Sequence, residues 1–276
     1  TAAASADEVR EFIAHVGYPV ILKPRDGAGA SGAARVDSDR ELEPALHALG
    51  SGRSIAVEEF IEGHEGFLDT LALRGQVVHD FATHYYPNVL EAMRTRWISP
   101  QFIATNRIDS IGEYQQLREM GLRVNEALGI GTSATHMEWF FGPKGLKFSE
   151  IGCRPPGVGA WDLYSAANDL DIYRQWADSI VHGQVWGKPS RQYSAGIVAL
   201  RPSQDGTITG YAGIDDVQAR HGQWVIDAHF PDAGTPTQPV AAGYWANAYV
   251  RMRHPDYDVL HGMLDDVGRT VQVFAS

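Results

Sequence analysis

Two glutamates near the middle of the chain, Glu138 and Glu150, have the spacing of residues that face each other across a β-hairpin. Two apolar-rich runs flank a Gly-Pro-Lys-Gly segment between them. Pro favours the first corner of a type I turn and Gly favours the left-handed position after it, so Pro143–Gly145 is predicted to form a three-residue loop. In that register Gly142 pairs with Leu146, and Glu138 therefore pairs with Glu150.

The predicted hairpin would gather negative charge on one face. Because side chains alternate along a strand, Glu138 and Glu150 are expected to share a face with Phe140 and Phe148. Two carboxylates that lie directly opposite each other repel. A divalent cation with oxygen ligands would relieve that repulsion. The alternative is a surface hairpin whose two glutamates point into water.

A stiff turn, Gly-Cys-Arg-Pro-Pro-Gly, follows the second strand of the hairpin. It is expected to place Arg154 beside the carboxylates, where a guanidinium can bind an oxyanion or a carboxylate with two hydrogen bonds. His136 is expected on the same face, either as a group that orients a carboxylate or contacts substrate, or as a structural hydrogen-bonding residue. Cys153 is expected to be a small buried side chain, with a reactive thiol as the alternative.

An early glycine-rich segment has the composition of a phosphate-binding loop. Lys23 ends a predicted strand, and Gly27, Gly29 and Gly32 follow it, with Ser31 in the same loop. Glycines let backbone N–H groups approach phosphate oxygens, and Lys adds positive charge. A dinucleotide-binding turn fits less well, because the residues after Gly32 do not resemble a helix start. A flexible hairpin is the other alternative.

The next strand ends in Glu-Glu-Phe-Ile-Glu-Gly, with Glu58 as its first glutamate. An extended backbone at Glu59–Ile61, which includes Phe60, could offer a donor and an acceptor to the edge of an adenine ring. Glu65 follows Gly63 closely and could reach a ribose hydroxyl. The alternative interpretation is that these are solvated acidic residues.

Together these motifs resemble the ATP-grasp superfamily: strand-Lys-Pro with a Gly/Ala/Ser loop, Glu-Glu-Phe-Ile-Glu-Gly, His-x-Glu, and Glu-x-x-x-Arg. The resemblance covers about Val9 to Gly183. It is closest to carboxylate–amine ligases of the L-amino acid ligase type, and more distant to biotin carboxylase and carbamoyl-phosphate synthetase. It implies an α+β fold in which two subdomains grip ATP between their sheets.

The resemblance also assigns roles to individual residues. Lys23 and Arg154 would be catalytic, the first at the nucleotide phosphates and the second at the acyl-phosphate and the tetrahedral species after it. Glu138 and Glu150 would hold Mg²⁺, with Mn²⁺ as an alternative ion. The residues assigned to the nucleotide are Lys23, Gly27, Gly29, Ser31, Gly32, Glu58, Glu59, Phe60, Ile61 and Glu65.

The implied reaction is ATP-dependent ligation. A substrate carboxylate attacks the γ-phosphate of ATP, and an amine captures the resulting acyl-phosphate. The alternatives are a biotin-carboxylase-like or purine-pathway carboxylase that uses bicarbonate, and an ATP-binding module without activity. Gly152 stands where many members have an Asn ligand, so one metal ligand is expected to be lost or supplied by water. The family's first phosphate-binding Lys and N-terminal domain are not visible, so the chain is expected to begin part-way through a longer protein.

The amino-acid composition limits the classes of binding partner that the chain is expected to have. A net charge of -11 without a Lys/Arg cluster disfavours nucleic acid and anionic membranes, which leaves small-molecule carboxylate and amine substrates. No apolar run approaches the length of a membrane span. A single cysteine excludes an internal disulfide and indicates a reducing, cytoplasmic setting. The oligomeric state stays open, with a homodimer as one alternative.

The elements that must position these residues follow from hydrophobic periodicity and from the Gly and Pro positions. We expect an ATP-grasp domain at 1–190, with a nucleotide lid at about 1–65 and a central part at 66–190, and then a small C-terminal α/β subdomain at 191–276. The segment 87–107 is expected to be a long irregular loop that helps to select the substrate. Helices are expected at 7–16, 39–49, 110–128, 215–221 and 257–269, and a long helix or a helix pair is expected at 162–182. Strands are expected at 18–24, 34–36, 54–60, 67–73, 76–85, 195–201, 224–229 and 244–252.

Overall fold

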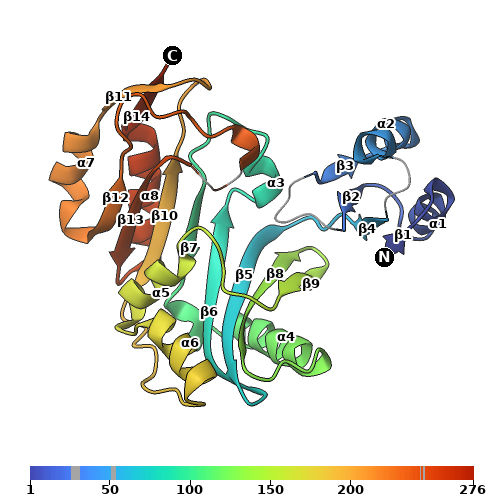
Figure 1. The fold of residues 1–276 in the computed structure, drawn as a ribbon, viewed down its shortest axis with the longest axis horizontal. Coiled ribbons are helices and arrows are strands. Elements are labelled where there is room, and N and C mark those ends of the chain that lie inside the picture. The colour runs from blue at the N-terminus through green and yellow to red at the C-terminus, as the bar shows by residue number, and fades with distance from the viewer. Residues whose placement is uncertain (26–31, 51–53, 243, 245) are drawn as a thin grey trace. The chain divides into compact units, whose positions relative to one another are not determined.

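The structure is a computed structural model that describes residues 1–25, 32–50, 54–242, 244 and 246–276 (Figure 1). The chain divides into two compact units, Thr1–Glu62 and Gly63–Ser276. Among the described residues, every pairing between named strands is antiparallel. The predicted α+β class is therefore confirmed, and the parallel sheet of a dinucleotide-binding fold is excluded.

The first unit is a four-stranded sheet in the order β1-β4-β2-β3, with two helices. Its elements are β1 (Ala2–Ala3), α1 (Ala6–Val16), β2 (Val20–Pro24), β3 (Ala34–Val36), α2 (Asp39–Leu49) and β4 (Ile55–Glu59). Alternate strand residues such as Leu22 and Val57 pack with Val9 and Leu42 of the helices into one core. Because side chains alternate, the residues between them, including Lys23, lie on the opposite face of the sheet.

Capping residues define the ends of the two helices in this unit, so the helix bounds can be predicted from the sequence. The side chain of Ser5 accepts a hydrogen bond from the backbone N–H of Glu8 and caps α1. Gly17 and Gly50 follow the two helices with φ angles of 81° and 89°, which favour glycine. The expected helices at 7–16 and 39–49 are therefore confirmed to within one residue.

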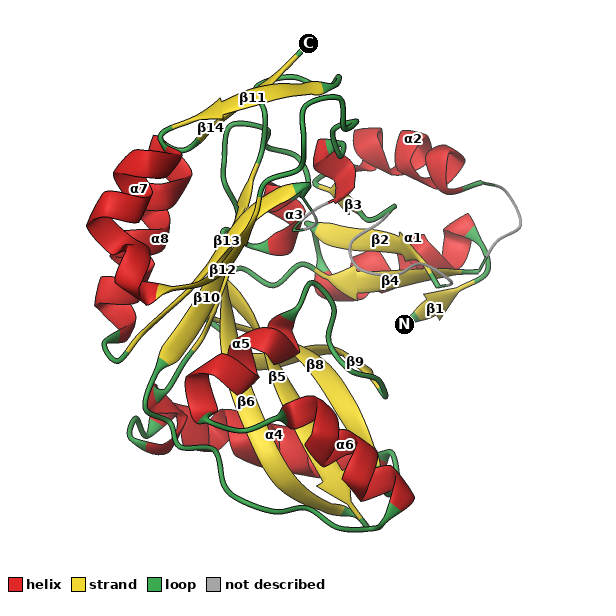
Figure 2. Cartoon of the chain, turned by 60° about the vertical axis from the view of Figure 1, so that its left-hand side comes forward, coloured by secondary structure: helices red, strands yellow, loops and turns green. Residues whose placement is uncertain are grey.

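The second unit is built on an eight-stranded sheet in the order β12-β13-β10-β7-β6-β5-β8-β9, with a two-stranded sheet, β11-β14, beside it (Figure 2). The strands are β5 (His64–Leu73), β6 (Gln76–Tyr86), β7 (Gln101–Ala104), β8 (Ser133–Gly142), β9 (Gly145–Gly152), β10 (Ser194–Leu200), β11 (Ile208–Ala212), β12 (Val225–His229), β13 (Ala248–His254) and β14 (Gln272–Ala275). The α-helices are α3 (Val89–Ala92), α4 (Glu113–Ala127), α5 (Ala160–Asn168), α6 (Ile172–Val181), α7 (Ile214–His221) and α8 (Tyr257–Thr270).

Helices cover both faces of the large sheet. On one face, Leu117 of α4 packs in a core with Met137 and Trp139 of β8, and α8 packs over β10 and β13. On the other face, α5 and the start of α6 pack over a core that includes Phe67 and Phe81 (Figure 2). This second face also carries the polar residues of the candidate site, because Asp69 and His136 alternate with the residues that face α4.

The structure overturns one expectation about a segment and decides between two alternatives for another. The segment 87–107 is not one irregular loop, because α3 lies in it and β7 forms a fully buried strand between β6 and β10. At 162–182 the helix pair is confirmed rather than one long helix, since Asp169, with φ 51°, ends α5. The division at residue 190 stays a prediction, although β10, β12 and β13 continue the sheet that holds β5 and β8. Across the described ranges, no helix combines the length and apolar content needed to cross a membrane.

Candidate functional site

The loop of the β8–β9 hairpin is shorter than predicted. Gly142 pairs with Gly145 rather than with Leu146, so the loop holds two residues instead of three. Gly145 has the predicted left-handed backbone, with φ 73°, but it also belongs to the ladder. The predicted register is therefore wrong next to the loop.

A β-bulge restores the predicted register at the other end of the hairpin. The register shifts between positions 137 and 139, where Glu138 alone on β8 faces two residues of β9, one of which is Glu150. Beyond the bulge, Met137 pairs with Ile151 as predicted. Both Leu146 and Ile151 pack against the core under α4. Their odd spacing would put them on opposite faces of a regular strand, so the bulge is the physical means by which both reach this core.

The bulge also changes which aromatic residue accompanies the carboxylates. Phe148 pairs with Trp139 and so joins the face of Trp139, which is the face opposite Glu138. The expectation that Phe148 lies beside Glu138 is therefore wrong. Glu138 and Glu150 nevertheless lie on one face of the sheet at neighbouring positions, as the sequence predicts.

A buried polar chain connects Glu138 to α5. His136 Nδ1 lies 2.6 Å from Asp69 Oδ1, and His136 Nε2 lies 3.7 Å from Glu138 Oε1. The hydroxyl of Tyr164 donates to the other Asp69 oxygen and lies 3.0 Å from Thr83 Oγ1. Both Asp69 and His136 are buried. The geometry fixes the orientation of the imidazole ring directly beside Glu138.

This environment sets the charge of His136. Burial lowers the pKa of the imidazole, but the nearby carboxylates of Asp69 and Glu138 outweigh burial and raise its pKa to about 10. At neutral pH the ring is therefore an imidazolium between two carboxylates. It partly balances the negative charge of this face.

Glu65 is a third carboxyl group in the same region, and it is not a solvated residue. Its side chain is buried, and its Oε2 atom accepts a hydrogen bond of 2.7 Å from the backbone N–H of Val89. Burial, reinforced by the charges of Glu138 and Glu150, raises the pKa of Glu65 to about 8. The proximity of Glu138 and Glu150 adds to the effect of burial, so three carboxyl groups influence one another in this region. The predicted contact of Glu65 with a ribose stays a prediction.

The turn after β9 exposes a guanidinium and a thiol. The Arg154 side chain is exposed and donates from Nη1 to the carbonyl of Pro155 over 2.9 Å. It folds over Gly152, where an added Cβ would lie 3.3 Å from Arg154 Cγ. A side chain at position 152 would thus have to displace Arg154 slightly. Cys153 is exposed, so its expected role as a buried residue is wrong.

In the first unit, two residues assigned to the nucleotide lie together on the sheet face away from the helices. Lys23 Nζ lies 3.0 Å from Glu58 Oε1, across the β2–β4 pair. Arg35 stacks over the ring of Phe60, with 4.2 Å between the guanidinium carbon and the ring centroid.

The backbone after β4 suits the predicted contact with an adenine edge. Glu59 pairs with Val20 in the ladder, whereas the N–H of Ile61 has no hydrogen-bond partner among the described residues. Gly32, with φ 75°, is described, and Gly27, Gly29 and Ser31 lie outside the described residues.

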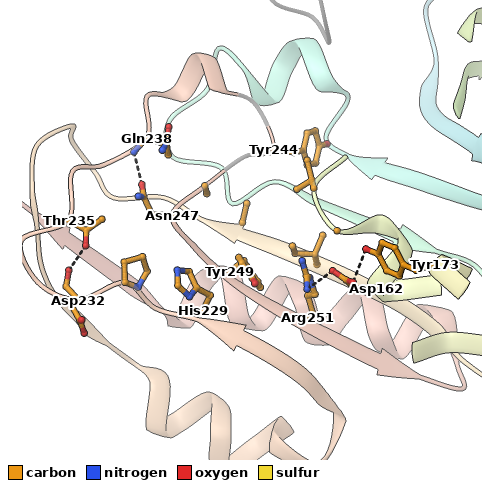
Figure 3. A pocket seen from close by; sticks show the side chains of 16 residues that line it. Asp162, Tyr173, His229, Asp232, Thr235, Gln238, Tyr244, Asn247, Tyr249 and Arg251 are labelled. Atoms are coloured by element: carbon orange, nitrogen blue, oxygen red, sulfur yellow. Dashed lines mark hydrogen bonds and ion pairs between the residues drawn. The ribbon is translucent and has the colours of Figure 1, made fainter. Parts of the chain in front are cut away.

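A pocket of about 820 Å³ lies within the second unit (Figure 3). It opens on the sheet face that carries Glu138, over β10, β12 and β13. Residues before and inside α5 close one end, and the loop after β12 closes the other. Tyr244 lines the pocket and packs against Tyr85 with 4.9 Å between ring centroids. Tyr85 in turn lies on the same face as Glu65, so the pocket and the carboxylates are neighbours along one surface.

One arginine lies at the base of this pocket. Arg251 Nη1 lies 3.0 Å from Asp162 Oδ2 and 3.1 Å from Asp227 Oδ2. The hydroxyl of Tyr173 donates to the other Asp162 oxygen over 2.9 Å. Gly159, with φ 71°, lets the guanidinium approach the start of α5, because an added Cβ would lie 2.0 Å from Arg251 Nη2. No sequence motif marks these residues, since tertiary pairing alone brings them together.

The fold and the site define an ATP-binding class of α+β protein. A family model described as the ATP-grasp domain matches residues 1–169, and the chain belongs to this family.

Similar proteins span several activities. The chain is 26% identical over 172 residues to the carbamoyl phosphate synthase large chain of Mycobacterium sp. (strain JLS). The aligned segment covers 60% of this chain and 15% of that protein. It is 25% identical over 221 residues to the formate-dependent phosphoribosylglycinamide formyltransferase of Bacteroides thetaiotaomicron, covering 78% of this chain and 55% of that protein. The chain thus spans about half or less of the length of these curated relatives.

Solved structures share the fold. The crystal structure of an L-amino acid ligase from Bacillus licheniformis matches with a TM-score of 0.71 and 18% identity. The match covers 99% of this chain and 72% of that protein. At this identity the likeness establishes the fold, and the predicted ATP-grasp architecture is confirmed.

Proposed function

We propose that the chain is the ATP-binding and catalytic part of an ATP- and Mg²⁺-dependent ligase, which activates a carboxylate as an acyl-phosphate for capture by an amine. Membership in the ATP-grasp family supports ATP as a substrate. The observation that carries the proposal is the bulged hairpin, which puts Glu138 and Glu150 on one face beside a pocket large enough for an organic substrate.

The residues present fit a Mg²⁺ ion. Mg²⁺ is commonly held by one or two carboxylates, with phosphates and water as the other ligands. Glu138 and Glu150 supply two carboxylates on one face of the hairpin. Within the described ranges, no three His, Cys, Asp or Glu side chains form a complete metal cage, which suits a site shared with phosphates. When bound, Mg²⁺ or Mn²⁺ would neutralise charge on the transferring phosphoryl group.

The chain's own residues then have separate tasks. In the first unit, Lys23 would neutralise phosphate charge, and the N–H of Ile61 would donate to the adenine edge. In the second unit, the His136 imidazolium would hold Glu138 in a fixed orientation. The exposed guanidinium of Arg154 would stabilise the acyl-phosphate and the oxyanion that forms when the amine attacks it.

The size of the pocket favours an organic substrate over bicarbonate. Pockets of several hundred Å³ suit molecules of drug or metabolite size. A volume of about 820 Å³ exceeds what an ion as small as bicarbonate would need.

The exposed thiol of Cys153 is in keeping with a reducing cytoplasmic setting.

The test is phosphate release from ATP and Mg²⁺ in the presence of pooled amino acids, with new products followed by mass spectrometry. The full-length gene product should be used. We expect amino-acid-dependent phosphate release and an amide product, both lost in Glu150→Gln. Phosphate release that no carboxylate stimulates, with ATP still bound, would contradict the ligase proposal.

Arg154→Ala separates chemistry from nucleotide binding. Loss of one oxyanion-stabilising donor is expected to lower turnover by roughly 100- to 1,000-fold. ATP affinity, measured by calorimetry, should stay within about twofold, because Arg154 acts on the acyl group. A loss of ATP affinity as large as the loss of turnover would assign Arg154 to the nucleotide instead.

A further inference from the structure

The two ends of the pocket differ in their distance from the carboxylates of the hairpin. In the strand order, β5, β6 and β7 separate β8 from β10, and β12 is the outermost strand on the pocket side. The end near β10 and Tyr244 therefore faces Glu138. Asp232 and Thr235, in the loop after β12, line the opposite end of the pocket from Tyr244 (Figure 3). By the strand order, this end is the more distant one from Glu138. If the proposed reaction occurs at Glu138, a ligand in this pocket has its non-reacting end at Asp232.

The near end holds one cation that is already balanced. Arg251 is the only Lys or Arg among the described residues that line the pocket. Its side chain is only 12% exposed, whereas its two partners, Asp162 and Asp227, are 40% and 43% exposed. Its guanidinium also stacks on Tyr249, 4.6 Å from the ring centroid. Because Arg251 is shared by two carboxylates, its charge is already balanced within the protein.

The remote end has a carboxylate without a counter-ion. Asp232 lines the pocket and is exposed. Within the described part of the chain its carboxylate has no hydrogen bond or ion pair, since Thr235 bonds only the backbone oxygen of Asp232. Its neighbours in the lining are neutral groups such as Thr235 and Gln238, together with His229. A ligand cation at this end would meet a carboxylate and no competing Lys or Arg.

We propose that this pocket selects a ligand with a positive charge at its non-reacting end, such as an amino acid with a basic side chain or a diamine. The assignment of the reacting end rests on the proposed function, but the charge preference rests on the pocket alone. An exposed or half-exposed ion pair contributes modestly, so a preference of about fivefold is expected. The preference should weaken as salt is added, because Asp232 is open to solvent.

The test compares three ligands of similar length by calorimetry, without ATP: lysine, norleucine and glutamate. The chain should bind lysine about fivefold more tightly than norleucine, and glutamate most weakly. Asp232→Asn should reduce lysine affinity to that of norleucine and leave norleucine unchanged. Asp216→Asn, an exposed carboxylate on α7 outside the pocket lining, is the matched control and should change neither affinity.

Equal affinities for lysine and norleucine, tighter binding of glutamate, or a lysine preference that survives Asp232→Asn would each overturn the proposal. Absence of binding by all three ligands at millimolar concentration would overturn it as well. Because the assay contains no ATP, a chain that fails to release phosphate can still show the lysine preference. A chain with ligase activity can equally lack it, so the two proposals fail separately.

Discussion

The two ends of the eight-stranded sheet hold their charges in different ways. At the hairpin end, Asp69 and His136 are buried, with side-chain exposures of 3% and 10%, and a tyrosine hydroxyl completes the chain. At the pocket end, Asp162 and Asp227 are about two-fifths exposed and share one arginine. At the buried end, the side chains are held by their own hydrogen bonds before a ligand binds. Such preorganisation suits a functional site whose geometry must stay the same for different ligands. The open end leaves carboxylates available to whatever ligand is bound.

The largest effect is expected from Asp69→Asn, because it removes the counter-ion of a buried imidazolium. Breaking such a pair typically lowers the free energy of unfolding by about 3–5 kcal/mol. Urea denaturation would measure it. Asp258→Asn is the matched control, since Asp258 is 75% exposed and pairs with Arg107, and it should change stability by less than about 1 kcal/mol. Equal losses in the two variants would remove the distinction between buried and open charges.

A smaller effect is expected from Glu65→Gln, and it depends on pH. The folded pKa of Glu65, about 8, lies above its ordinary value of 4.5, so the folded state keeps a proton that the unfolded chain loses. The resulting stability is fully present below about pH 4.5 and is lost as pH rises through 8. Within this window the free energy of unfolding should fall by roughly 1.4 kcal/mol per pH unit. Glu65→Gln should remove that part of the slope between pH 5.5 and 7.5 in urea titrations. If the free energy of unfolding depended on pH equally in both proteins, Glu65 would be a solvated residue rather than a buried one.

The smallest change in stability is expected from Gly159→Ala at the pocket end. The left-handed backbone at this position disfavours Ala by roughly 1–2 kcal/mol. The new methyl group would also displace the Arg251 guanidinium, so ligand binding in the pocket should weaken in calorimetry. Gly129→Ala is the matched control, because Gly129 has φ 64° and open space around its missing Cβ. If both variants bound ligand equally well, Arg251 would not shape the pocket.

Local signals allowed the sequence to predict the carboxylate pair and the longer helices, although not the four-residue helix α3. Ser5 and Gly17 define α1 because caps act within one turn. The four-residue strand β7 was missed because so short a run carries no periodicity, and its burial comes from strands on both sides.

The remaining differences depend on packing between distant segments. The hairpin register was wrong near the loop because α4 requires both Leu146 and Ile151 in its core. The ion pairs of Arg251 were not predicted, since Asp162, Asp227 and Arg251 come from α5, β12 and β13 and meet only in the folded sheet.

The bulge in β9 has a consequence for how the chain tolerates changes in length. The ladder is in register on both sides of it, with Met137 opposite Ile151 and Trp139 opposite Phe148. Deletion of Ser149 would leave both of these pairs in place and set Glu150 squarely against Glu138. Deletion of a residue elsewhere in β9 would instead turn part of the strand over. The hairpin can therefore lose one residue at the bulge without exchanging the two faces of the strand.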